Sequence, residues 1–133
     1  MERRADPPIS KLMTKILHTS SEEDLIDKVA ADMNRFHVYA LPVVSADGRI
    51  FGIITANDLS RFQAAKKNPK TVRAWELCSY KPLRVSPDTP TTDVAKLMLT
   101  HHVHHILVSN EDNLYGIVST FDFVQQYVLS RQT

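Results

Sequence analysis

Two pairs of residues in this chain combine a hydroxyl group with a carboxylate at the same spacing: Thr55 with Asp58, and Ser119 with Asp122. A hydroxyl residue followed three positions later by an acidic residue is typical of the first turn of a helix. The first N–H groups of a helix have no partner within it, and with the positive end of the helix dipole they stabilise phosphate. An ionised carboxylate one turn into the helix accepts hydrogen bonds from two neighbouring hydroxyls, such as those of a ribose. The two pairs therefore indicate a nucleotide-binding chemistry that occurs twice.

The same spacing also has an explanation that needs no ligand. In a capping box, the hydroxyl and carboxylate groups satisfy each other's backbone N–H groups at the start of a helix. A single Thr-x-x-Asp or Ser-x-x-Asp sequence favours this explanation. Here, however, a glycine and two branched apolar residues precede both pairs, as Gly52-Ile53-Ile54 and Gly116-Ile117-Val118. This repetition keeps ligand binding open beside helix capping.

The two pairs belong to an internal repeat that extends through most of the chain. Met33 and Met98 are 65 positions apart, whereas Asp58 and Asp122 are 64 positions apart. The second copy therefore lacks one residue between these points, in the turn between its two predicted strands, where a deletion costs little. Short runs of branched apolar residues before each pair predict buried strands.

Each copy is predicted to contain a short lead-in segment, a helix, two strands joined by a turn, and a second helix. In the first copy the helix opens at Ser21, the strands cover residues 38–44 and 50–54, and the second helix follows Thr55. In the second copy the helix opens at Ser86, the strands cover residues 104–108 and 114–118 around a turn at 111–113, and the last helix carries Val124, Tyr127 and Val128. Pro42 predicts that its strand lies at a sheet edge or contains a bulge.

We expect residues 1–8 to form a flexible tail, residues 9–65 and 72–130 to form the two repeats, and residues 66–71 to form a linker. Pro7 and Pro8 disfavour a helix in the tail, and the linker is basic and interrupted by Pro69. Neither repeat is expected to be stable alone, because its small sheet would have one uncovered face. The fold class is therefore predicted to be α/β, or α+β, with two repeats packed on each other.

The composition is that of an ordinary globular protein, because the 133 residues are 43% hydrophobic and 23% charged. A net charge of +1 gives no electrostatic reason to expect nucleic acid or an anionic membrane as a partner. No apolar run is long enough to span a membrane, and the first residues lack the apolar core of a signal peptide. The single cysteine, Cys78, excludes an internal disulfide and is expected to pack in the core. We therefore predict a cytoplasmic protein.

The repeated pattern resembles a pair of CBS domains, the repeat named after cystathionine β-synthase, from about Ile9 to Val128. The resemblance is carried by Leu12-Met13, Ala40-Leu41-Pro42-Val43-Val44, Asp47-Gly48-Arg49, Gly52 to Asp58, Ser86-Pro87-Asp88-Thr89, and Gly116 to Asp122. It implies two β-α-β-β-α repeats that face each other through their sheets with pseudo-twofold symmetry. It also implies a homodimer of such pairs.

Members of this family bind adenosyl ligands, among them AMP, ADP, ATP and S-adenosylmethionine, in the clefts between the repeats. Ligand binding then regulates an attached or partner protein. The resemblance therefore implies a stand-alone regulatory module that is not an enzyme and requires no cofactor. Such a module would signal the occupancy of its nucleotide sites to an unidentified partner protein.

The resemblance also assigns individual residues to the two implied sites. Asp58 and Asp122 would hold the ribose hydroxyls, and Thr55 and Ser119 would meet phosphate. The residues implied to line the base or close over it are Tyr39, Ala40, Pro42, His104, His105, Ile16, His18, Thr19, Lys81 and Arg84. Phe121 departs from the first copy, which has an asparagine there, and is expected to crowd the second site.

Two alternatives remain beside a nucleotide sensor. One is a ligand-free module that dimerises or docks on another protein and uses both residue pairs as helix caps. The other is metal binding through a histidine cluster that comprises His101, His102, His104 and His105, because nearby imidazoles on a helix can share an ion. The repeat pattern places a helix end within this cluster, which would splay the four side chains. The chain has no P-loop, nucleophile elbow or His-Glu-x-x-His sequence, so an enzyme is the least favoured class.

Overall fold

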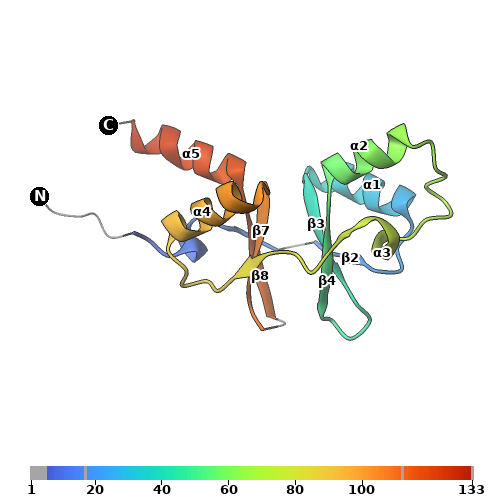
Figure 1. Cartoon of the computed structure of the whole chain (residues 1–133), viewed down its shortest axis with the longest axis horizontal. Helices are drawn as coiled ribbons and strands as arrows, with labels where there is room; N and C mark the ends of the chain where they lie inside the picture. Colours follow the sequence, from blue (N-terminus) through green and yellow to red (C-terminus); the bar gives the residue numbers. More distant parts are fainter. Residues whose placement is uncertain (1–5, 17, 112, 133) are drawn as a thin grey trace, which may run out of the picture. The chain divides into compact units, whose positions relative to one another are not determined.

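The computed structural model describes residues 6–16, 18–111 and 113–132, which fall into two compact units (Figure 1). The first unit lies within Leu17–Pro82, and the second combines parts of Met1–Ile16 and Leu83–Thr133. In the part of the chain that is described, each unit contains one four-stranded sheet with helices packed against it. The predicted mixed α/β class is therefore confirmed.

The sheet of the first unit has the strand order β2-β3-β4-β5. Its strands are β2 (Ser20–Ser21), β3 (Ala40–Val44), β4 (Ile50–Thr55) and β5 (Ser79–Tyr80). β2 runs parallel to β3, whereas β4 runs antiparallel to both β3 and β5. β2 pairs only with Val43 and Val44, so Pro42 is paired on one side alone, with Ile53 of β4, in keeping with the predicted edge position. The alternative that Pro42 suggested, a bulge, lies one residue further on, between Val43 and Val44.

The sheet of the second unit has the order β1-β8-β7-β6. Its strands are β1 (Thr14–Lys15), β6 (Arg84–Val85), β7 (His105–Asn110) and β8 (Asn113–Ser119). β6 runs parallel to β7, and β8 runs antiparallel to β7 and β1. The β7–β8 hairpin also shifts its register, between Val108 and Ser109, so both hairpins are irregular at equivalent places. Asp112, in the predicted turn between these strands, lies outside the described residues.

The helices complete two copies of one order of elements. They are the 3-10 helix η1 (Ile9–Lys11), α1 (Ile26–Phe36), α2 (Ala56–Ala64), α3 (Ala74–Leu77), α4 (Thr91–His101) and α5 (Thr120–Ser130). The order β2-α1-β3-β4-α2 returns as β6-α4-β7-β8-α5, which confirms the predicted β-α-β-β-α repeat. α1 and α4 both end at a histidine with left-handed backbone, His37 at φ 55° and His102 at φ 53°.

The predicted starts of the first helix in each repeat are wrong by several residues. α1 begins after Leu25 and α4 begins after Pro90, rather than at Ser21 and Ser86. The Ser21 hydroxyl accepts a hydrogen bond from the Glu23 amide at 3.2 Å, which closes a local turn. Ser86 also closes a turn, because its carbonyl accepts from the Thr89 amide at 3.1 Å. Serine side chains favour such turns as readily as helix caps, so the signal lies one turn too early.

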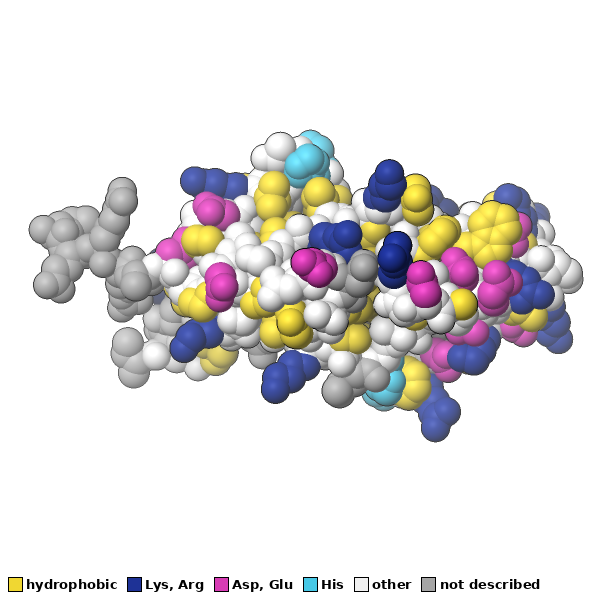
Figure 2. Space-filling model, turned by 90° about the horizontal axis from the view of Figure 1, so that it is seen from below, with side chains coloured by type: hydrophobic (Ala, Val, Ile, Leu, Met, Phe, Trp, Pro, Cys, Tyr) yellow, Lys and Arg dark blue, Asp and Glu magenta, His cyan; other side chains and the backbone are white. Residues whose placement is uncertain are grey.

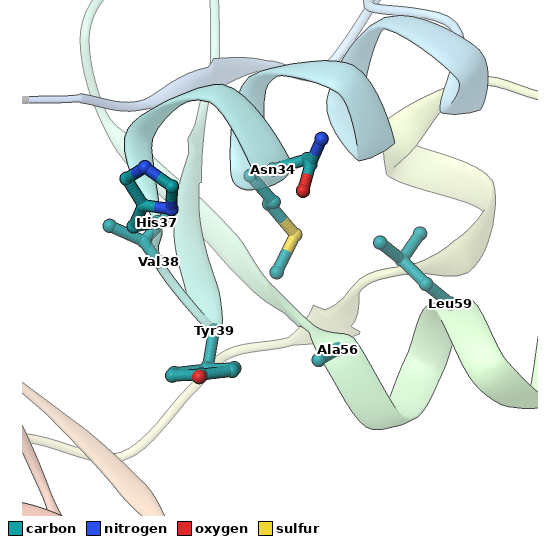
Figure 3. Close-up of a pocket in the computed structure, with 7 residues that line it drawn as sticks. Asn34, His37, Val38, Tyr39, Ala56 and Leu59 are labelled. Carbon is teal, nitrogen blue, oxygen red and sulfur yellow. The ribbon is translucent and has the colours of Figure 1, made fainter.

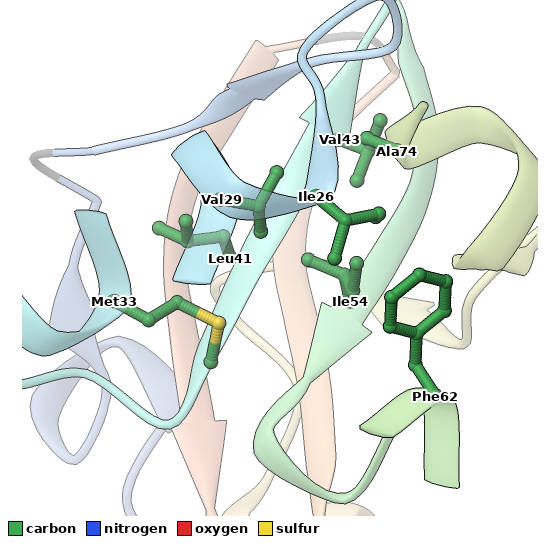
Figure 4. Close-up of a cluster of buried hydrophobic side chains, with 8 residues drawn as sticks. All are labelled: Ile26, Val29, Met33, Leu41, Val43, Ile54, Phe62 and Ala74. Atoms are coloured by element: carbon green, nitrogen blue, oxygen red, sulfur yellow. The ribbon is translucent and has the colours of Figure 1, made fainter. Parts of the chain in front are cut away.

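Each compact unit contains the short segment that precedes the main helix of the other repeat. This lead-in segment is η1 and β1 in the second unit, and α3 and β5 in the first. β1, which precedes the first repeat's main helix, pairs with β8, and β5, which precedes the second repeat's main helix, pairs with β4. The apolar side chains of these segments follow the same exchange. Ala74 of α3 is fully buried in the core of the first unit, beside Val43 of β3 (Figure 4). Ile9 of η1 is fully buried in the core of the second unit, against Val94 and Ile106.

The glycine of each repeated strand is required by this exchange. Gly52 faces Tyr80 of β5 in the sheet, and a Cβ atom on Gly52 would lie 2.6 Å from the Ser79 carbonyl oxygen. Gly116 faces Lys15 of β1, and its Cβ atom would lie 2.8 Å from the Thr14 carbonyl oxygen. Both distances are shorter than real Cβ contacts allow. The repeated glycine therefore makes room for the exchanged strand.

Part of the predicted tail is bound to the second unit. The predicted tail covers residues 1–8, of which residues 1–5 lie outside the described residues. The Asp6 carboxylate accepts a hydrogen bond from the Thr91 hydroxyl at 2.6 Å, and the Pro7 carbonyl accepts one from the Thr91 amide at 3.0 Å. The bond from Thr91 lowers the pKa of Asp6. Pro90 has no side-chain acceptor for the first turn of α4, so Asp6 supplies the cap from a distant part of the chain.

The surface carries both signs of charge. On the face drawn in Figure 2, acidic and basic side chains lie interspersed, in keeping with the net charge of +1. Among the described helices, none is both long enough and apolar enough to span a bilayer.

Candidate nucleotide-binding sites

Thr55 and Asp58 form a capping box at the start of α2. The Thr55 hydroxyl accepts a hydrogen bond from the Asp58 amide at 3.2 Å. In return, Oδ2 of Asp58 accepts from the Thr55 amide at 2.8 Å and from its hydroxyl at 3.0 Å. The local spacing alone dictates this geometry, because the two side chains replace partners that the first helical turn lacks.

The second oxygen of the Asp58 carboxylate is also engaged. Oδ1 accepts a hydrogen bond from the guanidinium of Arg61, one helical turn further on, at 2.5 Å. Asp58 is only 4% exposed, whereas the Arg61 side chain is 69% exposed. Arg61 thus connects an almost fully buried carboxylate to the surface.

Ser119 and Asp122 repeat the capping box at the start of α5. Oδ2 of Asp122 accepts from the Ser119 amide at 2.8 Å and from its hydroxyl at 3.2 Å. The residue equivalent to Arg61 is Gln125, and no residue in the described part of the chain donates a hydrogen bond to Oδ1 of Asp122. Asp122 is also half-buried rather than buried. The two carboxylates therefore make the same bonds to the backbone through Oδ2. They differ at Oδ1, which has a side-chain donor among the described residues in Asp58 alone.

The register of each hairpin brings the predicted base-lining residues to these helix starts. Ala40 faces Thr55 across β3 and β4, and the Tyr39 carbonyl accepts a hydrogen bond from the Ala56 amide at 2.8 Å. Ala40 is buried and Tyr39 is 75% exposed. Pro42, two residues further along the same strand, is fully buried. The hairpin register thus brings Tyr39 and Ala40 next to the helix start that carries Thr55 and Asp58.

The second repeat has the same arrangement with different side chains. His105 faces Ser119 across β7 and β8, and the His104 carbonyl accepts from the Thr120 amide at 3.0 Å. Burial lowers the pKa of His105, and the neighbouring His104 lowers it further, whereas the charge of Asp122 acts in the opposite direction. His105 is therefore held neutral beside the Asp122 carboxylate at neutral pH.

Two stretches, residues 16–19 and 81–84, are expected to close over the base. In each of them the chain passes from one compact unit to the other. Ile16 donates to the Tyr115 carbonyl at 3.1 Å, and Arg84 donates to the Glu111 carbonyl at 3.1 Å, so both belong to the second unit. His18, Thr19 and Lys81 belong to the first unit, where Thr19 and Lys81 are exposed and His18 is half-buried. The His18 ring stacks on Phe36 with 3.5 Å between centroids, and the Lys81 ammonium lies 5.4 Å from the Tyr80 ring centroid. Leu17, between Ile16 and His18, lies outside the described residues.

The histidine cluster does not converge. His101 ends α4, His102 is its left-handed cap, and both are exposed. His104 is exposed and His105 is half-buried on β7. Within the described ranges, no three His, Cys, Asp or Glu side chains are placed to hold a metal ion together. The structure therefore gives no support to the metal-binding alternative.

A pocket of about 280 Å³ lies in the first unit, between the end of α1 and the start of α2 (Figure 3). It is lined by Met33, Asn34, His37, Val38, Tyr39, Ala56 and Leu59. Of the predicted site residues only Tyr39 lines it, so the pocket is separate from the Asp58 carboxylate. Neither this pocket nor Arg61 is predicted from the sequence. Arg61 could have been found from its spacing, because acidic and basic residues three apart on a helix are neighbours.

Comparisons with known proteins agree with the internal repeat. The family model for the CBS domain matches the chain twice, at residues 9–65 and 74–128. The uncharacterized protein YlbB of Bacillus subtilis is 33% identical over 126 residues, which cover 94% of this chain and 82% of YlbB.

Two solved structures have the same fold. The CBS domain pair of protein MJ0100, in complex with methylthioadenosine and S-adenosyl-L-methionine, is 19% identical with a TM-score of 0.85, covering 96% of this chain and 100% of that one. CBSX2 in complex with AMP is 21% identical with a TM-score of 0.78, covering 95% of this chain and 99% of that one.

Proposed function

Because this chain belongs to the CBS domain family, we propose that it is a regulatory module that binds an adenosyl ligand: AMP, ADP, ATP or S-adenosylmethionine. One observation carries the proposal. At both helix starts the same register brings together a Thr or Ser, an Asp and the two residues that we propose line the base. The proteins CBSX2 and MJ0100, which share this fold, were solved with adenosyl ligands.

The chemistry of each helix start suits the parts of a nucleotide. The carboxylate of Asp58 or Asp122 accepts hydrogen bonds from ribose hydroxyls. Thr55 and Ser119 lie at the positive ends of α2 and α5, where phosphate is stabilised. Across from the helix start, Ala40 would offer the base an apolar surface in the first repeat, whereas His105 would offer an imidazole ring in the second.

Signalling to a partner protein requires that the ligand prefer one arrangement of the protein over another. A tenfold preference corresponds to about 1.4 kcal/mol of coupling free energy. The proposal therefore includes an unidentified protein partner that recognises the liganded arrangement. It also includes a cytoplasmic location, which a single cysteine suits because reducing compartments do not maintain disulfides.

Thermal unfolding in the presence of AMP, ADP, ATP, S-adenosylmethionine, deoxy-AMP and GMP tests the proposal. A ligand at a hundred times its Kd adds about 2.7 kcal/mol, or several degrees of Tm. We expect shifts with adenine ribonucleotides or S-adenosylmethionine, and smaller shifts with deoxy-AMP and GMP. The double variant Asp58→Ala/Asp122→Ala should remain folded and lose the shift. A parent protein that responds to no compound in the panel contradicts the proposal.

A second function is favoured by the capping boxes themselves. Both are complete without any ligand, which is what a purely structural pair of repeats requires. In that case the chain is an interaction module, and Asp58→Ala changes only stability. The flat response to the ligand panel described above is the result that this second function predicts.

We also propose that the module dimerises through α5. The helix exposes five large apolar side chains: Phe121, Val124, Tyr127, Val128 and Leu129. Their equivalents on α2 are small or polar: Asn57, Ser60, Gln63, Ala64 and Ala65. Asp122 is the single charged residue of α5, and the Arg131 guanidinium just after the helix lies 4.9 Å from the Tyr127 ring centroid, so each copy brings one charge of each sign to an interface about a twofold axis.

Light scattering after size-exclusion chromatography tests this assembly. We expect the parent protein to elute as a dimer and Val124→Glu to elute as a monomer, because a buried unpaired carboxylate is costly at an interface. Ser60→Glu places the same charge at the equivalent point of α2 and should leave the dimer intact. A monomeric parent, or a dimer that only Ser60→Glu disrupts, rules out α5 as the interface.

A further inference from the structure

The carboxylates of Asp58 and Asp122 differ in the hydrogen-bond partner of their Oδ1 atom. Oδ1 of Asp58 holds the Arg61 guanidinium at 2.5 Å. Asp122 has Gln125 at the equivalent position, and none of the described residues donates to its Oδ1. The capping hydrogen bonds to Oδ2 are nearly the same length in both repeats, 2.8 Å to the backbone amide in each. At the carboxylate oxygens themselves, the difference is therefore the partner of Oδ1.

From this difference we propose that Arg61 is an internal competitor for the ribose, which closes the first site until it is displaced, so that an adenosyl ligand fills the Asp122 site first. The inference rests on the proposed function, because it assumes that both carboxylates are ribose acceptors. It reverses the expectation that Phe121 makes the second site the weaker one. Phe121 itself is 69% exposed.

The hydrogen-bonding capacity of the carboxylates supports this order of binding. At Asp58 the ribose hydroxyls must displace the Arg61 guanidinium, so a bond between two charged groups is lost for bonds in which only the carboxylate is charged. At Asp122 the hydroxyls meet an oxygen whose acceptor sites are free of side-chain donors. The same ligand contacts therefore yield less net affinity in the first repeat.

The first site can still open because the two partners of the ion pair differ in exposure. Asp58 is 4% exposed, so a ligand reaches its Oδ1 only after the guanidinium has left. The Arg61 side chain is 69% exposed and can rotate into solvent without disturbing the core. Arg61 thus acts as a reversible gate, and the first site responds at a higher ligand concentration than the second.

A reciprocal exchange of the two residues tests the gate. Arg61→Gln gives the first repeat the side chain of the second, and Gln125→Arg gives the second repeat the side chain of the first. AMP is titrated into the parent and each variant by isothermal calorimetry. Lys67→Gln, which removes a cation from the exposed linker, is the control for net charge.

In the parent we expect a tighter and a weaker binding event, of which Asp122→Ala abolishes the tighter. Arg61→Gln should strengthen the weaker event roughly tenfold, the worth of a charge-assisted hydrogen bond, and Gln125→Arg should weaken the tighter event by a similar factor. Melting temperatures confirm that each variant is folded.

Two outcomes overturn the inference and leave the proposed function standing. In one, AMP binds and Arg61→Gln leaves both events unchanged relative to Lys67→Gln. In the other, Asp58→Ala instead of Asp122→Ala removes the tighter event. If AMP and the other compounds of the thermal panel bind neither the parent nor Arg61→Gln, the proposed function fails and the inference fails with it.

Discussion

The starts of α2 and α5 are the same piece of backbone with different surroundings. Both contain a complete capping box, and both follow a glycine that makes room for an exchanged strand. Beyond the caps, the first repeat has Arg61 and Ala40, whereas the second has Gln125 and His105. The residues that form the helix start are therefore the same in kind in both repeats. The residues around its carboxylate differ.

The largest effect should come from the shared glycines. Gly52→Ala is expected to destabilise the protein by about 1–3 kcal/mol, because its Cβ meets the Ser79 carbonyl and the Cys78 side chain. Gly116→Ala should cost somewhat less, because its Cβ lies 2.8 Å from the Thr14 carbonyl, against 2.6 Å between Gly52 and Ser79, and the side chain that it meets is the flexible Met13. Urea unfolding measures both, with the exposed Ser60→Ala as control. Equal stability of Gly52→Ala and the parent would contradict the close approach of β5.

The next effect separates the two capping carboxylates. Asp58→Ala should cost about 1–2 kcal/mol, because it removes both a helix cap and the acceptor of Arg61. Asp122→Ala should cost about 1 kcal/mol, the value of a cap alone. Urea unfolding without ligand makes the comparison. A larger cost for Asp122→Ala would show that Arg61 does not stabilise the first helix start.

Replacing the histidine that ends the main helix of each repeat should have a smaller effect on stability, and the same effect in both repeats. His37 and His102 hold left-handed backbone at the ends of α1 and α4, where glycine has no steric penalty. We expect His37→Gly and His102→Gly each to stabilise the protein by about 0.5–1 kcal/mol. Thermal unfolding of the two variants and of His101→Gly, inside α4, provides the test. Destabilisation by all three would mean that the histidine side chains matter more than the backbone strain.

The smallest effect concerns the pH dependence of the second repeat. Burial lowers the pKa of His105 in the folded protein below its unfolded value, so protonation favours unfolding. The stability that neutral His105 contributes is complete above the unfolded pKa and is lost as pH falls through the folded pKa. Between about pH 7 and about pH 5 the parent should lose more stability than His105→Ala, which copies Ala40 of the first repeat. Parallel pH curves for the two proteins would contradict this assignment.

Local signals explain which parts of the fold the sequence could predict. Thr55 and Ser119 are both hydroxyl residues with an aspartate three positions later, and α2 and α5 begin directly after them, as predicted. Ser21 and Ser86 carry a similar signal but close turns instead, because serine bonds its neighbours in either conformation.

Features that depend on distant residues could not be predicted in this way. The pairing of β1 with β8 joins Thr14 to Ile117, and two-residue strands carry no pattern of their own. Asp6 caps a helix that begins 85 residues later, so no spacing rule indicates it. Arg61 is different, because its distance from Asp58 is local. The rule that acidic and basic residues three apart on a helix are neighbours therefore indicates the pair from sequence alone.

Because the lead-in segments are exchanged, the stretch of chain that is repeated in the sequence is not the stretch that forms one hydrophobic core. The sequence repeats as two consecutive blocks, yet each hydrophobic core takes one strand and one short helix from the other block. Cleavage in the linker near Lys67 would therefore release two fragments that each lack part of a core and can regain it only from the other. The chain should behave as a split protein whose halves reconstitute on mixing, and a gene encoding either half alone would encode an incomplete domain.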